Sequence, residues 1–216
     1  DRGFLSAQEF FDDGKYYEAL YEFQSVKTYD QGEEDFKNKY IAQIYSILKN
    51  DKEATPYLNK LNSDDKDLLL GKNYLENGSS DQAINSLNKA KNSNLESAEV
   101  YYYLGESYFK KKEYELAFQN FEQSKKMGFV TDNLLKNSGV CAYYYGNFID
   151  AIVNLEEAKK TLISDVTLNN YLGMSYFNVA RKDLAIETLR NSLLLNSSKN
   201  IESAETAVNL SLIFDD

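Results

Sequence analysis

The 216-residue sequence contains no histidine and no tryptophan, and it has one cysteine, one proline and 10 glycines. Without histidine, the chain lacks the commonest general base and metal ligand. The single Cys141 excludes an internal disulfide and leaves no cysteine or histidine cluster for zinc. So little proline and glycine is also atypical of an all-β protein, which needs many turns.

Two further absences concern partners and cofactors. No apolar run approaches the ~20 residues that a membrane helix needs. Positive charge is scarce, because 34 acidic residues outnumber 24 basic ones and give a formal net charge of −10. An acidic surface repels phosphate backbones, so we expect no nucleic-acid partner. No glycine-rich phosphate loop is present, and we expect no cofactor and no bound metal.

The compartment stays open at this level. No signal peptide begins the chain. The helical pattern is already under way at Asp1, so we expect the natural chain to begin earlier. Cytoplasm and bacterial periplasm both remain compatible with the sequence.

What the sequence does contain is a repeated register. Small residues recur at intervals of 35, 29, 34, 34 and 34 residues, and these are Ala7, Ala42, Gly71, Gly105, Gly139 and Gly173. Twelve positions after each of them stands an alanine in every repeat, namely Ala19, Ala54, Ala83, Ala117, Ala151 and Ala185. Sixteen positions after each stands a large apolar residue: Phe23, Leu58, Leu87, Phe121, Leu155 or Leu189. Six alanines in one register are not expected by chance.

The spacing has a physical explanation as a pair of packed helices. A small residue lets the second helix of the pair approach the first closely, and the alanine marks where the two meet. The large residue lies one turn further along the second helix, on the same face. Hairpins of this kind cannot bury their apolar faces alone, so they stack on one another.

This pattern resembles the tetratricopeptide repeat family over about residues 3–195. The resemblance implies an all-α, right-handed α-solenoid of helix-turn-helix repeats. We expect six repeats in residues 1–199, followed in residues 200–216 by a capping helix or a truncated seventh repeat. Two features depart from the family pattern: the early tryptophan of the first helix and the proline after the second helix are both absent.

Helix boundaries follow from capping and turn residues. In the shortened second repeat, Thr55 is predicted to cap the second helix, with Pro56 as its first helical residue. The predicted first helices span 3–12, 33–50, 64–77, 96–111, 132–145 and 165–179. The predicted second helices span 16–27, 55–61, 81–91, 114–127, 148–161 and 182–196, and a final helix spans 200–214. Because the second repeat is about five residues short, we also expect a local change in helix stacking between Leu58 and Leu70.

Nothing in the sequence favours catalysis. Cys141 has no histidine to activate it, and a small buried thiol is the simpler interpretation. The acidic pairs Asp12-Asp13 and Asp64-Asp65 lie near predicted helix ends, where they suit the helix dipole or solvent. We therefore predict that the protein is not an enzyme.

The resemblance implies a binding groove on the concave face, lined by the first helices. Groove residues are expected at −3, +1 and +4 from the small residue. Some family members hold a peptide C-terminal carboxylate with a lysine followed by an asparagine at −3 and +1. Here Lys39 precedes Gln43 and Lys136 precedes Val140, so that clamp is not matched. The expected site is instead an aromatic strip with polar neighbours: Tyr102, Phe109, Lys136, Asn137, Val140, Tyr143, Asn170, Met174 and Phe177.

Three functional hypotheses remain. The first is a scaffold that binds a peptide segment or partner protein in this groove. The second is a structural protein that self-associates into a homo-oligomer through its ends or aromatic faces. The third is a solenoid that binds an apolar small molecule or glycan on the aromatic strip. Fold alone does not separate them.

Overall fold

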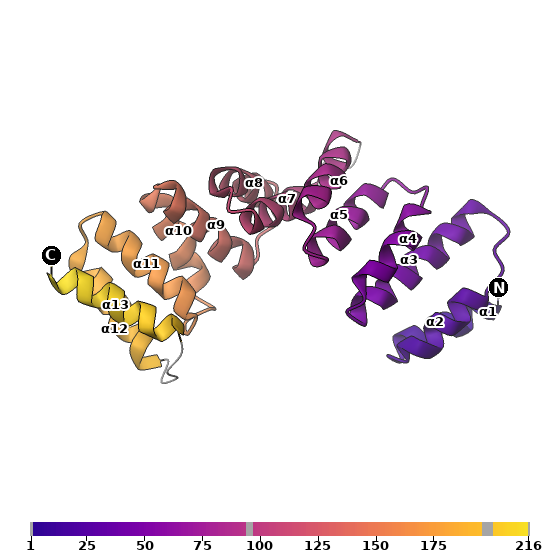
Figure 1. The fold of residues 1–216 in the computed structure, drawn as a ribbon, viewed down its shortest axis with the longest axis horizontal. Helices are drawn as coiled ribbons and strands as arrows, with labels where there is room; N and C mark the ends of the chain where they lie inside the picture. The colour runs from indigo at the N-terminus through magenta and orange to yellow at the C-terminus, as the bar shows by residue number, and fades with distance from the viewer. Residues whose placement is uncertain (1, 94–96, 196–200, 216) are drawn as a thin grey trace. The chain divides into compact units, whose positions relative to one another are not determined.

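The computed structural model describes residues 2–93, 97–195 and 201–215, and within these ranges it contains helices and no strand (Figure 1). The helices that open each repeat are α1 (Arg2–Asp12), α3 (Gln31–Ile47), α5 (Lys66–Glu76), α7 (Ala98–Lys110), α9 (Asp132–Tyr145) and α11 (Val166–Asn178). Their partners are α2 (Tyr16–Ser25), α4 (Asp51–Asn59), α6 (Ser80–Asn92), α8 (Tyr114–Lys126), α10 (Phe148–Lys159) and α12 (Lys182–Leu195). A last helix, α13 (Ile201–Asp215), follows. Predicted ends at 96, 196 and 200 lie outside the described residues.

The boundary predicted for α4 is wrong. The helix begins at Asp51, so Pro56 lies inside it rather than at its first position. Asp51 and Glu53 occupy the first turn, where acidic side chains suit the helix dipole. The Thr55 hydroxyl caps nothing and instead donates to Asn73 Oδ1 at 2.7 Å.

The predicted register of the repeats is confirmed by burial. All six alanines of the +12 column are fully buried, and every large residue of the +16 column is 5% exposed or less. A Cβ added to Gly105 would lie 2.6 Å from the Phe121 ring. The other helical glycines of the column, Gly71, Gly139 and Gly173, face the leucine sixteen residues later in the same way. The small residue therefore sets how closely the two helices of each pair approach.

Contacts divide the chain into two compact units, residues 1–103 and 104–216, and each is described separately. In the first unit, α1 packs on α2, α3 on α4 and α5 on α6. Neighbouring pairs meet where α2 packs on α3 and α4 packs on α5. The first helices α3 and α5 do not pack closely against each other, and a cavity lies between them.

The second unit is stacked more tightly. Here α9 contacts α8, α10 and α11, and α13 contacts both α11 and α12. The shared core includes Ala151 and Ala185 of the alanine column and Leu155 and Leu189 of the +16 column, and Ile213 of α13 joins it. Side chains cap the starts of two helices. The Thr131 hydroxyl accepts a hydrogen bond from the backbone N–H of Leu134, and the Asp165 carboxylate accepts one from the backbone N–H of Leu168. This rigid stack positions the predicted aromatic strip.

Candidate functional site

Four apolar members of the predicted strip lie together on the first helices of the second unit. Phe109, Tyr143, Met174 and Phe177 are each partly buried and pack against the core cluster. Their inner faces support the repeat stack, while the rest of each side chain stays open to solvent. The strip is thus a partly exposed apolar band whose side chains also pack against the repeat core.

Tyr143 is the centre of an aromatic cluster that the sequence did not reveal. Its ring lies 5.1 Å from the Tyr171 ring and 5.6 Å from the Phe148 ring, both edge-on. Tyr144 stacks on Tyr114 at 4.3 Å, and the hydroxyls of Tyr144 and Tyr171 lie 2.6 Å apart. Tyr144 is 50% exposed, so the cluster reaches the surface. Such rigid, amphipathic rings are typical of interaction surfaces.

The hydroxyls of Tyr143 and Tyr171 remain protonated. Burial raises the pKa of Tyr143, and the nearby Tyr144 hydroxyl and Glu205 carboxylate raise it further. Burial likewise raises the pKa of Tyr171, with the hydrogen bond to Tyr144 as the next cause. These two residues therefore offer aromatic faces and neutral hydroxyl groups.

Three other predicted residues are less accessible than the strip requires. Val140 is 4% and Asn170 5% exposed, because the neighbouring repeats cover their side of the helix. Tyr102 is partly buried on α7 within the first unit, where its ring lies 5.1 Å from that of Tyr103. Val140 and Asn170 therefore support the face rather than line it, and Tyr102 belongs to the other unit.

The predicted polar flank is already engaged. Lys136 Nζ lies 3.1 Å from the Asp165 carboxylate, and Asn137 Nδ2 donates to Glu106 at 2.7 Å. Both contacts join neighbouring first helices of the second unit. A ligand that uses Lys136 or Asn137 has to compete with these partners, but partly exposed ion pairs contribute only about 0–1 kcal/mol and exchange readily.

Cys141 lies beneath this face and is fully buried. Burial strongly raises the pKa of its thiol, and the Glu106 carboxylate adds to the effect. A protonated, inaccessible thiol is neither a nucleophile nor a metal ligand. Among the residues that the structure describes, no group of three or more histidine, cysteine, aspartate or glutamate side chains could hold a metal ion.

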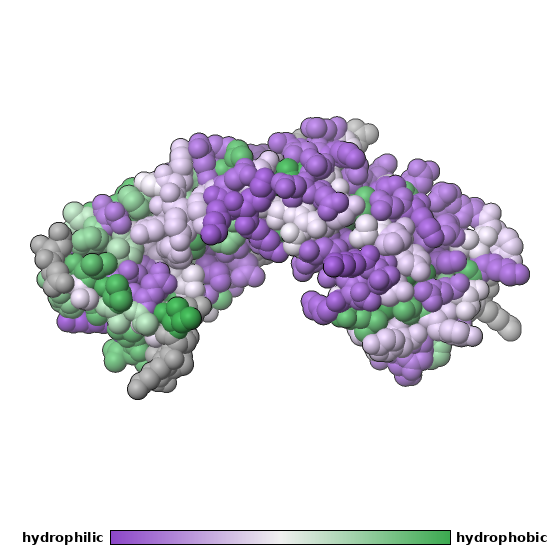
Figure 2. Space-filling model, in the orientation of Figure 1, coloured by the Kyte–Doolittle hydropathy of each residue, from purple (hydrophilic) through white to green (hydrophobic). Residues whose placement is uncertain are grey.

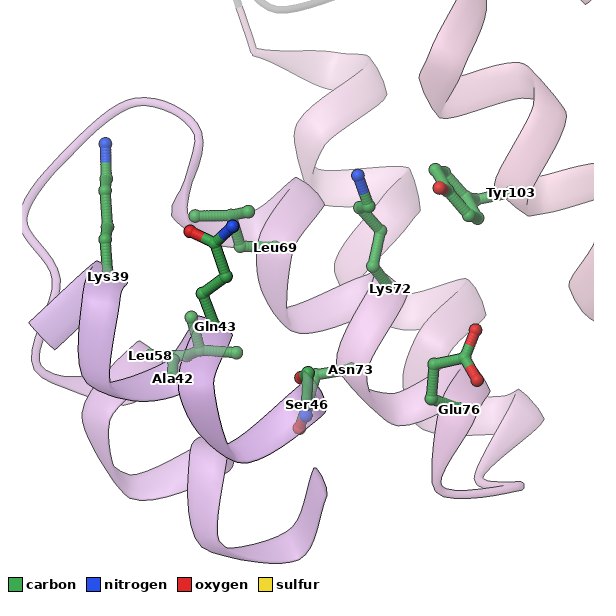
Figure 3. Close-up of a pocket in the computed structure, with 10 residues that line it drawn as sticks. All are labelled: Lys39, Ala42, Gln43, Ser46, Leu58, Leu69, Lys72, Asn73, Glu76 and Tyr103. Carbon is green, nitrogen blue, oxygen red and sulfur yellow. The ribbon is translucent and has the colours of Figure 1, made fainter. Parts of the chain in front are cut away.

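A second candidate site, which the sequence analysis did not select, lies between α3 and α5 of the first unit (Figure 3). It is a cavity of about 340 Å³. Its apolar floor is formed by Ala42, Leu58 and Leu69. Its rim is formed by polar side chains and one aromatic ring: Lys39, Gln43, Ser46, Lys72, Asn73, Glu76 and Tyr103. Four of these residues occupy the −3, +1 and +4 groove columns of the register, namely Lys39, Gln43, Ser46 and Lys72. Polar groove residues beside the short repeat were therefore a sequence signal for this site.

The described helices also include none that is long and apolar enough to span a membrane.

Figure 2 shows hydrophobic surface around α13 of the second unit. Ile201 is 87%, Val208 58% and Leu212 54% exposed on that helix.

Comparison with known proteins agrees with this arrangement. A tetratricopeptide repeat profile matches residues 99–126, which cover most of α7 and all of α8. The chain has the tetratricopeptide repeat fold. No curated protein matches the sequence.

Several solved tetratricopeptide repeat structures share the fold. YrrB, described as a TPR protein with an unusual peptide-binding site, has a TM-score of 0.70 at 14% identity over 81% of this chain and 92% of its own. MamA has a TM-score of 0.67 at 19% identity over 81% of this chain and 96% of its own. The chain from the APC/C hetero-tetramer Cut9-Hcn1 has a TM-score of 0.68 at 18% identity. That match covers 94% of this chain but only 40% of the longer chain.

Proposed function

We propose that the protein is an interaction scaffold that binds a peptide segment on the first-helix face of its second unit. The observation that carries this proposal is the partly exposed aromatic cluster centred on Tyr143. The cluster is held rigidly by the repeat core, so a ligand that covers it need not order it first. Tetratricopeptide repeat proteins commonly bind protein partners, and YrrB has a peptide-binding site.

The spacing of the strip suits an extended peptide. Phe109, Tyr143 and Phe177 occupy the same column of successive repeats, 34 residues apart. Packed helices stand ~8–10 Å apart and an extended peptide advances ~3.3 Å per residue. About every third peptide side chain can therefore meet one ring of the column. Met174 keeps the band apolar between Tyr143 and Phe177.

The test is a double variant, Tyr143→Ala with Phe177→Ala, in affinity purification from the native source followed by mass spectrometry. Aromatic anchors at interfaces typically contribute ~2 kcal/mol or more, so capture of the native partner should fall by at least about tenfold. The matched control is Ile149→Ala with Val153→Ala, which removes two exposed apolar side chains from α10. Circular dichroism establishes that both variants stay helical. Undiminished capture by the folded strip variant would remove this face as the binding site.

Self-association is a second candidate function, favoured by the exposed apolar residues of α13. A terminal repeat that is to stay in solution needs a polar outer face. Light scattering over a hundredfold range of protein concentration distinguishes the two functions. A molar mass that stays at that of one chain argues against self-association, whereas a rising mass that Val208→Ser with Leu212→Ser abolishes supports it.

A further inference from the structure

The cavity between α3 and α5 lies beside the short second repeat. Its second helix, α4, has nine residues, fewer than any other second helix. Thr55 of α4 bonds directly to Asn73 of α5, but α3 and α5 remain apart on the first-helix side. The separation opens a cavity of about 340 Å³, larger than one side chain requires.

Both cations of the cavity already have partners. Lys39 Nζ lies 2.9 Å from the Asp65 carboxylate. Lys72 Nζ lies 2.8 Å from Glu99 Oε1 and 4.9 Å from the centre of the Tyr103 ring. Figure 3 shows both amines toward one end of the cavity. That end is therefore close to electrically neutral.

Two polar side chains that line the cavity have no partners. Glu76 is exposed on α5 and makes no ion pair or hydrogen bond within the described part of the chain. Gln43 is exposed on α3, and its amide likewise has no hydrogen bond to any described residue. The apolar floor of Ala42, Leu58 and Leu69 lies on the Gln43 side of the cavity, and Glu76 lies on the other side, beyond Lys72 (Figure 3). A carboxylate and an apolar floor in one cavity complement a cation on an aliphatic stem.

The charge of the whole unit has the same sign as this carboxylate. Residues 1–103 contain 19 of the 34 acidic and 12 of the 24 basic residues, so this unit carries −7 of the net charge of −10. Such a field raises the local concentration of cationic ligands and disfavours acidic ones.

We propose that this cavity binds a lysine or arginine side chain of a peptide segment. The aliphatic stem lies over Ala42, Leu58 and Leu69, and the cationic head pairs with Glu76. The Gln43 amide hydrogen-bonds the peptide backbone. The inference rests on the proposed function only for its ligand class, because it uses no residue of the Tyr143 strip.

The direct test titrates ¹⁵N-labelled full chain with three synthetic hexapeptides. The first is acetyl-Gly-Ser-Leu-Lys-Ser-Gly-amide, and the other two replace its lysine with norleucine or with glutamate. Norleucine keeps the stem and removes the charge. An exposed ion pair contributes ~0.2–1 kcal/mol, so the lysine peptide should bind about 1.4- to fivefold more tightly than the norleucine peptide. Amide shifts should be centred on Gln43, Leu69 and Glu76.

Two substitutions of Glu76 then test the pairing itself. Glu76→Gln should abolish the preference for lysine over norleucine, and Glu76→Lys should make the glutamate peptide the tightest of the three. Glu9→Gln removes an exposed carboxylate from α1 of the same unit and should leave the preference unchanged.

Three results would overturn the proposal. These are equal affinity of the wild-type chain for the lysine and norleucine peptides, tightest wild-type binding by the glutamate peptide, or shifts centred away from the cavity. The Tyr143→Ala, Phe177→Ala variant should retain the lysine preference. Loss of native partner capture by that variant, together with an intact lysine preference, would separate the two sites.

Discussion

At the scale of single residues, side-chain volume determines how each helix pair packs. Four repeats place glycine opposite the large +16 residue, and the first two repeats place Ala7 and Ala42 there. The Cβ positions computed for those glycines lie 2.5–2.7 Å from the facing side chain, closer than any real contact. The alanine column twelve residues later has no spare volume either, since every member is fully buried.

Ala117→Leu should therefore destabilise the chain. Three added heavy atoms have to enter the contact between α7 and α8, and such overpacking costs about 1–3 kcal/mol. Thermal unfolding followed by circular dichroism measures the loss. Ala204→Leu on the exposed side of α13 is the control, and its melting temperature should stay near that of wild type. Equal melting of Ala117→Leu and wild type would show that the contact is looser than described.

One carboxylate should give the fold a specific acid sensitivity. The Thr28 hydroxyl donates to Glu34 Oε2 at 2.5 Å and lowers the pKa of that carboxyl, against an opposing effect of burial. The pKa of Glu34 is lower in the folded chain than in the unfolded chain, where it is about 4.5. The ionised carboxylate therefore stabilises the fold at pH values above about 4.5, and this stabilisation is lost as the pH falls through the folded-state pKa. Glu34→Gln should thus lower the urea midpoint at pH 7 more than at pH 3. Glu9→Gln should show a smaller difference between the two pH values.

At the scale of elements, the repeat register predicted nearly every helix because local rules and tertiary packing agree. The helix Asp132–Tyr145 has the predicted bounds, and Tyr16 and Tyr114 begin helices as expected. The exception is α4, where Thr55 and Pro56 suggested a start that the structure does not use. Thr55 bonds to Asn73, eighteen residues away, and a single-sequence rule cannot anticipate that partner.

Replacement of Pro56 distinguishes the two starts of α4. Inside a helix, proline lacks the N–H that would bond to the carbonyl of Lys52 and crowds the preceding turn. Pro56→Ala should therefore stabilise the chain by about 2 kcal/mol. This is the gain in helix propensity minus the stabilisation that proline provides by lowering the entropy of the unfolded chain. Urea unfolding measures the change, with Lys52→Ala on the exposed side of the same helix as control. If the helix began at Thr55, Pro56→Ala would leave stability unchanged or reduce it.

The candidate sites were less predictable than the helices. The column rule selected Phe109, Tyr143 and Phe177, which are partly buried against one core cluster, but it could not foresee that Val140 and Asn170 are covered by neighbouring repeats. The polar partners Lys136 and Asp165 are 29 residues apart, and their pairing depends on how successive repeats stack. The α3–α5 cavity also depends on how successive repeats stack. The short interval between Ala42 and Gly71 indicated altered stacking, but it did not indicate which side chains would line the cavity.

At the scale of the whole molecule, a repeat protein is stabilised mainly by contacts between neighbours. The second helices α2, α4 and α10 each pack on their own first helix and on the first helix of the next repeat. Ion pairs follow the same pattern: Lys39–Asp65, Lys72–Glu99 and Lys136–Asp165 each join one first helix to the start of the next. Stability is therefore expected to be local, with cooperativity that weakens along the chain.

Leu155→Ala tests how far that cooperativity extends. Leu155 is fully buried opposite Gly139, so the truncation leaves a cavity that costs about 2–5 kcal/mol. Because α10 packs on α9 and α11, amide hydrogen exchange should accelerate most in those three helices, while α1 to α4 keep their wild-type protection. Leu87→Ala, the equivalent change in the third repeat, should shift the loss to α5 and α6. Equal loss of protection in all helices after either substitution would mean that the two units unfold as one cooperative body, and the local description of stability would then be wrong.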